Sequence, residues 1–247
     1  MSLSNKIALV TGGSSGIGLG IAKLLAQQGA RVVITGRDAA KLAEAAQEIG
    51  SSASWAVVEA SKISDIDALF AKISEDYGRL DIVVANAGGG VVSTLGSITE
   101  EEVDSTFGAN VKGVIFTVQG ALPLLKAGGS VVIIGSTASF NPPPGMSVYG
   151  ASKAAVRNLV RAWIQELKGS GIRINVVSPG PVHTPGMERF LSGDEGAAVL
   201  ASMTAASMVG RIGVPEDIAH AVNFLTSDAA SYVNGIELFV DGGASQI

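Results

Sequence analysis

The sequence of 247 residues contains no cysteine, few aromatic residues and only two histidines. Without cysteine, the chain cannot form disulfides, thiolate metal sites or a cysteine nucleophile. With His183 and His220 as the only imidazoles, a histidine-based metal site is not expected. These absences leave oxygen and nitrogen side chains, above all Ser, Tyr, Lys and Asn, as the candidates for any chemistry.

Long apolar runs and blocks of like charge are also missing. The apolar stretches are interrupted by Gly, Pro and Asn, and none approaches the roughly 20 residues of a membrane span. The formal net charge is −5, with Lys and Arg scattered, which disfavours a basic surface for nucleic acid. The first ten residues lack the features of a signal peptide. We therefore expect a cytoplasmic protein that binds neither nucleic acid nor membrane.

Short β-branched runs alternate with amphipathic segments rich in Ala and Leu along the whole chain. This alternation is typical of an α/β fold, with a doubly wound parallel sheet and helices on both faces. Strands are predicted at 7–10, 31–35, 55–58, 82–85, 130–135, 173–178 and 236–240. Helices are predicted near 16–28, 38–49, 65–77, 99–125, 148–168 and 215–227. Seven strands suit one sheet, so we expect a single domain over residues 1–247.

Two helix starts and one long connection stand out. Thr99 and Glu102 form a capping-box pattern, and Pro215 stands where a first-turn proline is tolerated. The stretch 181–213 is predicted to be irregular because Gly186, Gly193 and other glycines interrupt it. Within it, residues 185–212 are predicted to form a lid over a binding site.

A glycine-rich turn connects the first strand to the first helix. Gly12, Gly16 and Gly18 permit a tight reversal and close approach of a pyrophosphate to the helix N-terminus. A glycine-rich turn alone is weak evidence. Here it closes the first strand–helix unit and a second strand follows at the expected distance, which favours dinucleotide binding.

The glycine spacing is GxxxGxG, and five further motifs follow it in order. They are Asn86-Ala87-Gly88, Asn110, Ser136, the Tyr149/Lys153 pair and Ser178-Pro179-Gly180. In this respect the chain resembles the short-chain dehydrogenase/reductase family, from about residue 5 to the C-terminus. The resemblance implies a Rossmann-like sheet with a nicotinamide cofactor across the carboxyl ends of the strands.

The resemblance also implies roles for four residues. An ordinary tyrosine, with a pKa near 10, is too weak an acid to ionise at neutral pH, and a nearby ammonium favours the phenolate. Tyr149 and Lys153 are spaced i, i+4 on a predicted helix, a spacing that is common by chance. By resemblance Tyr149 is the catalytic acid and base, Lys153 lowers its pKa and binds the nicotinamide ribose, and Ser136 donates to the substrate oxygen. Asn110 would mark a helix irregularity that holds a water linking Lys153 to solvent.

The end of the second strand predicts which cofactor is used. Gly36 stands where a carboxylate would bind both ribose hydroxyls of NAD, and Arg37 follows it. A missing carboxylate followed by Arg leaves space and a cation for a 2′-phosphate, so we predict NADPH. In the alternative interpretation Arg37 is a solvated turn residue, and Asp38 serves the ribose of NAD or caps the next helix. Ser15 also stands where many NADP-using members have a basic residue.

Further cofactor contacts are implied by resemblance, position by position. Asn86 would support the sheet, Gly88 would admit the adenosine side, and Glu59 replaces the family's usual Asp near the adenine. The predicted cofactor-binding residues are Gly12, Ser14, Ser15, Gly16, Ile17, Gly18, Arg37, Glu59, Ala60, Asn86, Gly88, Tyr149, Lys153, Pro179, Gly180, Val182 and Thr184.

The substrate is predicted to be an apolar ketone or secondary alcohol. Apolar residues cluster in the segments that flank the predicted site and serve equally well as core or as a substrate wall: Phe140, Met146, Met187, Phe190, Leu191, Met203 and Met208. Ketoacyl reductases of the family usually present arginines for an acidic carrier protein where this chain has Ala127, Ser130 and Ser170. The chain resembles bacterial NADPH-dependent secondary alcohol dehydrogenases and carbonyl reductases. The alternatives are a 3-oxoacyl-(acyl-carrier-protein) reductase and a non-catalytic NADPH sensor.

Family resemblance also implies a homotetramer, packed through the helices near 99–125 and 148–168 and through the C-terminal segment. The second of these helices has apolar residues on more than one side, which gives indirect support.

Overall fold

Parallel strands form one seven-stranded sheet in the computed structural model, which describes residues 2–192 and 196–245. The strand order is β3-β2-β1-β4-β5-β6-β7, and every neighbouring pair is parallel. The strands are β1 (Ile7–Val10), β2 (Arg31–Gly36), β3 (Ala53–Val57), β4 (Leu80–Ala85), β5 (Leu125–Ile134), β6 (Arg173–Pro179) and β7 (Glu237–Val240). The predicted Rossmann-like α/β fold is confirmed.

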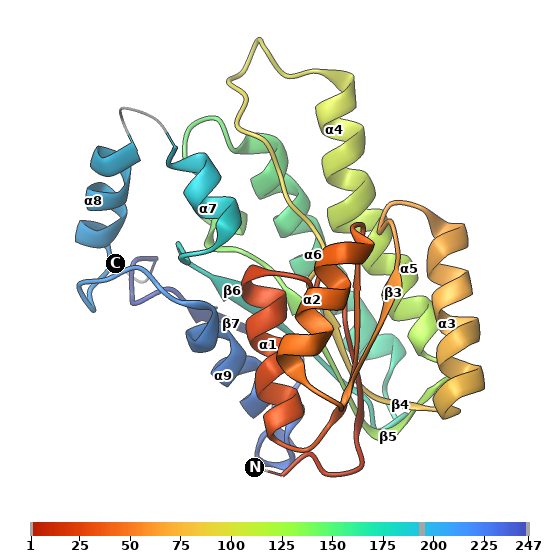
Figure 1. Cartoon of the computed structure of the whole chain (residues 1–247). Coiled ribbons are helices and arrows are strands. Elements are labelled where there is room, and N and C mark those ends of the chain that lie inside the picture. The colour runs from red at the N-terminus through yellow and green to blue at the C-terminus, as the bar shows by residue number, and fades with distance from the viewer. Residues whose placement is uncertain (1, 193–195, 246–247) are drawn as a thin grey trace.

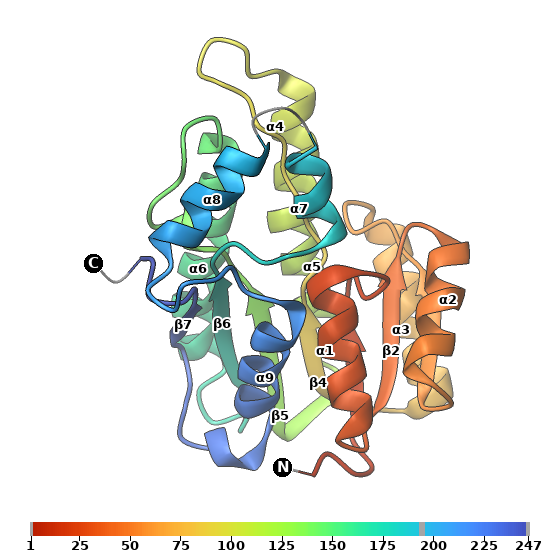
Figure 2. The ribbon, with the colours of Figure 1, turned by 60° about the vertical axis from the view of Figure 1, so that its left-hand side comes forward.

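Helices cover both faces of this sheet (Figures 1 and 2). One face packs against α1 (Gly16–Gln27), α2 (Ala39–Ile49) and α9 (Pro215–Thr226). The other packs against α3 (Ile63–Tyr77), α5 (Gly113–Ala121) and α6 (Ser147–Glu166). Each face therefore has its own apolar core, as expected where crossover helices lie on both sides of a parallel sheet.

The central strands contain continuous apolar runs because they are buried on both faces. Val83 and Val84 in β4, and Val131 and Val132 in β5, are all completely buried although neighbours in a strand point to opposite faces. A strand with one solvated face would alternate apolar and polar residues instead. The continuous β-branched runs in the sequence thus follow directly from the two-sided core.

The two predicted helix starts are confirmed. Thr99 caps α4 (Glu100–Phe107): its hydroxyl accepts from the Glu102 amide at 3.2 Å, and the Glu102 carboxylate accepts from the Thr99 amide at 2.9 Å. Pro215 is the first residue of α9. The first amides of a helix have no partner within the helix. The capping box at Thr99 supplies acceptors for such amides, and Pro215 has no amide hydrogen that needs one.

The predicted continuous helix 99–125 is wrong. After α4 the chain makes a π-helical turn, Gly108–Lys112, before α5, which ends at Ala121. β5 begins at Leu125, five residues before the predicted start at 130. Within this wider turn, Asn110 is buried. Helix α5 begins at Gly113, which lies against the Ala60 carbonyl, so a side chain at position 113 would collide with that carbonyl.

The stretch 181–213, predicted to be irregular, contains two helices. They are α7 (Pro185–Phe190) and α8 (Gly196–Ala206). Glycines suggested a loop, but the abundance of Ala in α8 supports a helix. Gly193 and the Phe190 side chain, both named in the prediction of a lid and substrate wall, lie outside the described residues. Both helices follow β6 and lie beyond the carboxyl ends of the strands (Figure 2).

The order of the strands predicts a ligand-binding crevice at the carboxyl ends of β1 and β4. The chain passes from β1 outward to β2 and β3, then returns to β4 on the other side of β1. The connections that leave the carboxyl ends of β1 and β4 therefore run in opposite directions along the sheet. In open α/β sheets, ligands bind between two such connections, beyond the carboxyl ends of the strands. In the described part of the chain, no helix combines the length and apolarity needed to cross a membrane.

Candidate active site

The turn between β1 and α1 lies at this crevice. Gly12 and Gly16 have φ angles of +66° and +54°, which favour glycine, and a side chain at Gly18 would collide with the Gly12 carbonyl. From the end of β4, the Asn86 side-chain amide donates to the carbonyls of Thr11 at 2.9 Å and Gly12 at 3.1 Å. The predicted supporting role of Asn86 therefore has a concrete form, a clamp between β4 and the glycine turn.

The N-terminus of α1 fits a phosphate group. Ser15 occupies the N-cap, yet its side chain makes no capping hydrogen bond, so the first-turn amides remain open to an anion. A Cβ atom at Gly16 would lie 3.2 Å from the Thr184 side chain, so the segment after β6 crosses this turn closely. Ile17 continues the same turn and is half-buried. The bare backbone and the open amides suit a pyrophosphate.

The end of β2 presents a cation without a carboxylate in the strand. The Arg37 side chain is 80% exposed, and its guanidinium lies 3.9 Å from the Glu59 carboxylate. The neighbouring Gly36 packs against the Ser14 hydroxyl. The Asp38 carboxylate accepts from the amides of residues 40 and 41 and thereby caps α2.

Ser136 and Tyr149 meet at the carboxyl end of β5. Ser136 directly precedes the short 3₁₀ turn η2 (Thr137–Ser139), and its hydroxyl oxygen accepts from the Ala138 amide at 3.1 Å. Tyr149 lies in the first turn of α6. Burial raises the pKa of the Tyr149 phenol, and a hydrogen bond from the Ser136 hydroxyl partly offsets that shift. The phenol is therefore a proton donor at neutral pH in this arrangement.

Lys153 lies one helical turn after Tyr149, with its ammonium group in the protein interior. The side-chain nitrogen donates to the Ile134 carbonyl at 2.8 Å and lies 5.8 Å from the centre of the Tyr149 ring. Burial lowers the pKa of Lys153 from 10.5 to about 8. In this structure the Lys153 ammonium bonds to a backbone carbonyl, and burial is the larger influence on the pKa of the Tyr149 phenol. That Lys153 lowers the pKa of Tyr149 stays a prediction.

Asn110 lies in the π-helical turn and is completely buried. Its side-chain oxygen accepts from the Gly89 amide at 2.9 Å, and its side-chain nitrogen donates to the Gly89 carbonyl at 2.8 Å and to the Ser152 hydroxyl at 2.9 Å. The predicted helix irregularity is present. Asn110 ties the segment after β4 to helix α6, beside Tyr149 and Lys153.

The glycines after β4 allow the backbone to approach this group closely. A Cβ atom at Gly90 would lie 2.7 Å from the Tyr149 ring, and one at Gly88 would lie 2.5 Å from the Asn110 side-chain oxygen. In the structure Gly88 lies next to the side chains of Asn110 and Lys153. Its contact with the adenosine side of a cofactor stays a prediction.

The segment after β6 completes the crevice. The Gly180 amide donates to the Val240 carbonyl at 3.1 Å, directly after Pro179, the last residue of β6. Val182 is buried and pairs with Gly213 in an isolated bridge, and the Thr184 hydroxyl accepts from the Met187 amide at 3.1 Å. These contacts hold 179–184 as an ordered strap leading from the sheet to α7.

Sequence reasoning missed a buried acidic residue next to this site. Glu237 in β7 has a side chain that is 13% exposed, and it accepts from the hydroxyls of Ser139 and Ser178. A carboxylate inside the apolar stretch 236–240 is unusual and could have been noticed, but its partners are far away in sequence.

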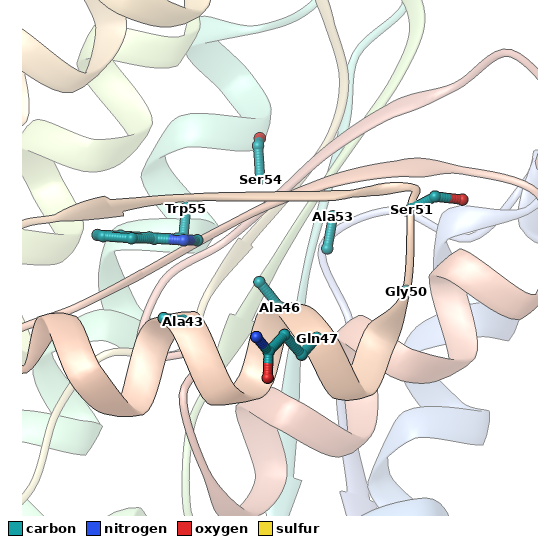
Figure 3. A pocket seen from close by; sticks show the side chains of 8 residues that line it. All are labelled: Ala43, Ala46, Gln47, Gly50, Ser51, Ala53, Ser54 and Trp55. Carbon is teal, nitrogen blue, oxygen red and sulfur yellow. The ribbon is translucent and has the colours of Figure 1, made fainter.

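Exposed apolar side chains gather in the segments that follow β4, β5 and α8. Val92 and Leu95 follow β4, Phe140 follows β5, and Met208 and Val209 follow α8. Phe140 and Met208 belong to the predicted substrate wall, whereas Met146, Met187, Leu191 and Met203 are half-buried. A shallow groove of about 700 Å³ between α2 and β3 is lined by none of the candidate site residues (Figure 3).

Comparisons with known proteins agree with this geometry. A family model described as enoyl-(acyl carrier protein) reductase matches residues 12–245. The chain is 42% identical to oxidoreductase asL5 of Sarocladium schorii, covering 99% of this chain and 98% of that protein. It is 40% identical to the 3-oxoacyl-[acyl-carrier-protein] reductase FabG of Chlamydia muridarum, covering 98% of both chains. It is 38% identical to human dehydrogenase/reductase SDR family member 4, covering 98% of this chain and 88% of that protein.

The chain belongs to the short-chain dehydrogenase/reductase family of oxidoreductases. The predicted family is thus confirmed, with a match that spans the glycine turn, the sheet and the strap after β6.

Proposed function

We propose that this chain is an NADPH-dependent ketone reductase and secondary-alcohol dehydrogenase in which Tyr149 donates the proton. The observation that carries the proposal is the meeting of a protonated phenol, a serine hydroxyl and a buried lysine beside an open glycine turn. When bound, the cofactor would supply a hydride to the carbonyl carbon. Ketone reduction needs that hydride, a proton for the oxygen and a dipole that stabilises the developing alkoxide.

The residues of the site divide this work. The Ser136 hydroxyl donates to the substrate oxygen, and Tyr149 transfers its proton to the same atom, which becomes the alcohol. Lys153 would bind the nicotinamide ribose, and Asn110 fixes the backbone that faces Tyr149. In alcohol oxidation the same proton returns to the Tyr149 phenolate, so that direction is favoured at higher pH.

The proposed cofactor contacts follow the crevice from end to end. Gly12, Ser14, Ser15, Gly16, Ile17 and Gly18 would hold the pyrophosphate, with Asn86 supporting the turn. Pro179, Gly180, Val182 and Thr184 would hold the nicotinamide amide, and Glu59 and Ala60 would lie near the adenine. The preference for NADPH rests on Arg37. The capping of α2 by Asp38 is a feature of the alternative interpretation and does not support NADPH.

We further propose an apolar substrate, a lid over 185–212 as far as it is described, and a single functional domain. The exposed side chains of Val92, Phe140 and Met208 support the apolar substrate because Val92 and Phe140 lie in the segments that leave β4 and β5, and Met208 follows α8. A homotetramer in the cytoplasm, acting on a small molecule, remains the expectation from the family.

The decisive experiment follows NADPH absorbance with a panel of ketones in the wild type, Tyr149→Phe and Tyr232→Phe. Tyr149→Phe should lower kcat by about 10²–10⁴-fold, the usual contribution of a general acid, with the dissociation constant of NADPH within about twofold. Tyr232 is fully exposed and serves as the matched control. Substantial turnover by Tyr149→Phe would overturn the mechanism.

A second candidate is reduction of 3-oxoacyl thioesters carried by an acyl carrier protein. The identity of 40% to a FabG reductase favours it. Against it, Ser130 is completely buried and donates to the Leu225 carbonyl, so position 130 offers nothing to a docking partner, and Arg157 faces Glu237. Adding acetoacetyl thioesters to the ketone panel distinguishes the two: a kcat/KM higher for the thioesters than for every ketone selects the second candidate.

A further inference from the structure

Glu237 is a carboxylate in the interior of an otherwise apolar strand. It is the first residue of β7, pairs with Val176 of β6, and its side chain is 13% exposed. A carboxylate so far from water is costly unless hydrogen bonds and an opposite charge compensate it. Its partners therefore indicate what the residue is for.

Three donors from three different segments converge on this carboxylate. One oxygen accepts from the Ser178 hydroxyl at 2.7 Å and from the Ser139 hydroxyl at 3.1 Å. The other oxygen lies 3.5 Å from the Arg157 guanidinium, whose side chain is 28% exposed. The four side chains form a compact network at the end of the sheet.

Each donor belongs to a segment that carries part of the candidate site. Ser139 ends the 3₁₀ turn that Ser136 begins. Ser178 directly precedes Pro179 and Gly180. Arg157 lies on α6, one turn after Lys153, so its side chain projects on the same side of the helix.

The Ser178 hydroxyl also touches the backbone that leads into Ser136. A Cβ atom at Gly135 would lie 2.5 Å from that hydroxyl oxygen, and the Gly135 amide donates to the Val177 carbonyl at 2.7 Å. The end of β5 therefore rests on Ser178. Any movement of Ser178 is transmitted to residue 135 and hence to Ser136.

We propose that Glu237 is a positioning residue that fixes Ser136 and the strap after Pro179 relative to helix α6. The proposal rests on the proposed function, because it assigns Glu237 a role at the same site. Glu237 touches none of the candidate reacting groups and acts through Ser139, Ser178 and Arg157. Active sites need such support because misplacement by about 1 Å can cost a hundredfold in rate.

The test compares Glu237 variants with variants of Asp81, a matched carboxylate at the opposite end of the sheet. Asp81 in β4 accepts from the Ile7 amide at 2.9 Å, and Lys6 and Arg79 lie within 3.7 Å of it. Its side chain is 20% exposed. Both carboxylates thus have three polar partners, but Asp81 lies near the amino end of its strand, β4.

Glu237→Ala should lower kcat by about 10–100-fold. Asp81→Ala should lose about as much thermal stability as Glu237→Ala but keep kcat within about twofold of the wild type. Glu237→Gln retains an acceptor for Ser139 and Ser178 and should recover most of the lost kcat. Equal effects of the Glu237 and Asp81 substitutions on kcat would overturn the proposal.

A binding measurement tests Glu237 independently of turnover. Glu237→Ala should weaken NADPH binding about tenfold while leaving the affinity for 2′,5′-ADP unchanged, because only the nicotinamide end adjoins Ser178. If the chain prefers the cofactor without the 2′-phosphate, NADH takes the place of NADPH in this comparison and ADP takes the place of 2′,5′-ADP. Equal weakening of both ligands would contradict a positioning role. If the wild type binds the cofactor but reduces no ketone or thioester, the proposed function fails, and this comparison still decides the role of Glu237.

Discussion

Lys153 has an electrostatic cost in the candidate site. Its ammonium group is buried and hydrogen-bonds to the Ile134 carbonyl, and no carboxylate of residues 2–192 or 196–245 forms an ion pair with it. Burial lowers its pKa from 10.5 to about 8. A site that would hold a cation for chemistry thus does so at the expense of the folded state, as functional sites often do.

This cost should appear in the pH dependence of stability. The folded state has the lower Lys153 pKa, so above about pH 8 the unfolded chain binds more protons and the free energy of unfolding rises with pH. Between pH 8 and pH 10 this residue should add about 2 kcal/mol. The difference between wild type and Lys153→Met, measured by urea unfolding at fixed protein concentration, isolates that contribution.

The matched control is Lys126→Met, which removes an exposed lysine. It should follow the wild type across the same pH range. A wild type that gains no stability relative to Lys153→Met from pH 8 to pH 10 would contradict the burial of a charged Lys153.

The π-helical turn is the element that brings the site together. It interrupts the helical segment between α4 and α5 at Gly108–Lys112 and turns Asn110 inward. There Asn110 satisfies both backbone groups of Gly89 and the Ser152 hydroxyl. π-turns within helices are frequently found at functional sites, because they redirect a side chain without ending the helix.

Replacing Asn110 with Ala should therefore loosen the segment after β4. We expect a loss of about 1–3 kcal/mol in the free energy of unfolding, since the Gly89 amide and carbonyl lose their side-chain partner and the Ser152 hydroxyl loses one of its two hydrogen bonds. Gln119→Ala, an exposed position on α5, is the control and should change stability by less than about 0.5 kcal/mol. Chemical denaturation of both variants decides the matter. If Asn110→Ala lowers the free energy of unfolding no more than Gln119→Ala does, the hydrogen bonds of Asn110 do not stabilise the fold.

Helices and strands were predictable from the sequence where their bounds depend on the pattern of neighbouring residues alone. The strand 7–10 is correct at both ends, because a run of four apolar residues between polar ones favours a short buried strand with these bounds. The break at Gly108–Lys112 was not predictable, because it depends on a contact between Asn110 and Gly89, 21 residues apart. The early start of β5 depends likewise on pairing of Leu125 with Leu80.

The same distinction applies to the candidate site. The glycine turn and the Tyr149/Lys153 pair are short-range patterns, and the structure brings them to one edge of the sheet. Glu237 could not be connected with Ser139 from the sequence, since 98 residues separate them and only the sheet order makes them neighbours. Contacts that depend on strand order are visible only once the fold is known.

At the scale of the whole molecule, cofactor binding should stabilise both halves of the sheet together. The crevice uses β1, β2 and β4 on one side and β5 and β6 on the other. A ligand bound only by the folded state stabilises it by about 2.7 kcal/mol at one hundred times its dissociation constant. For a chain of this length that corresponds to a rise of roughly 5–10 °C in Tm.

The identity of the cofactor can be measured through this rise. At equal concentration NADP⁺ should raise Tm by several degrees more than NAD⁺, because the exposed Arg37 follows β2, which has no carboxylate of its own, and can bind a 2′-phosphate in place of its exposed partner Glu59. Arg37→Ala should remove most of that difference by reducing the NADP⁺ effect alone. Arg31→Ala, an exposed arginine at the other end of the same strand, should leave both shifts unchanged. A larger shift with NAD⁺ in the wild type would instead favour the alternative in which Asp38 serves the ribose, and Asp38→Ala should then abolish it.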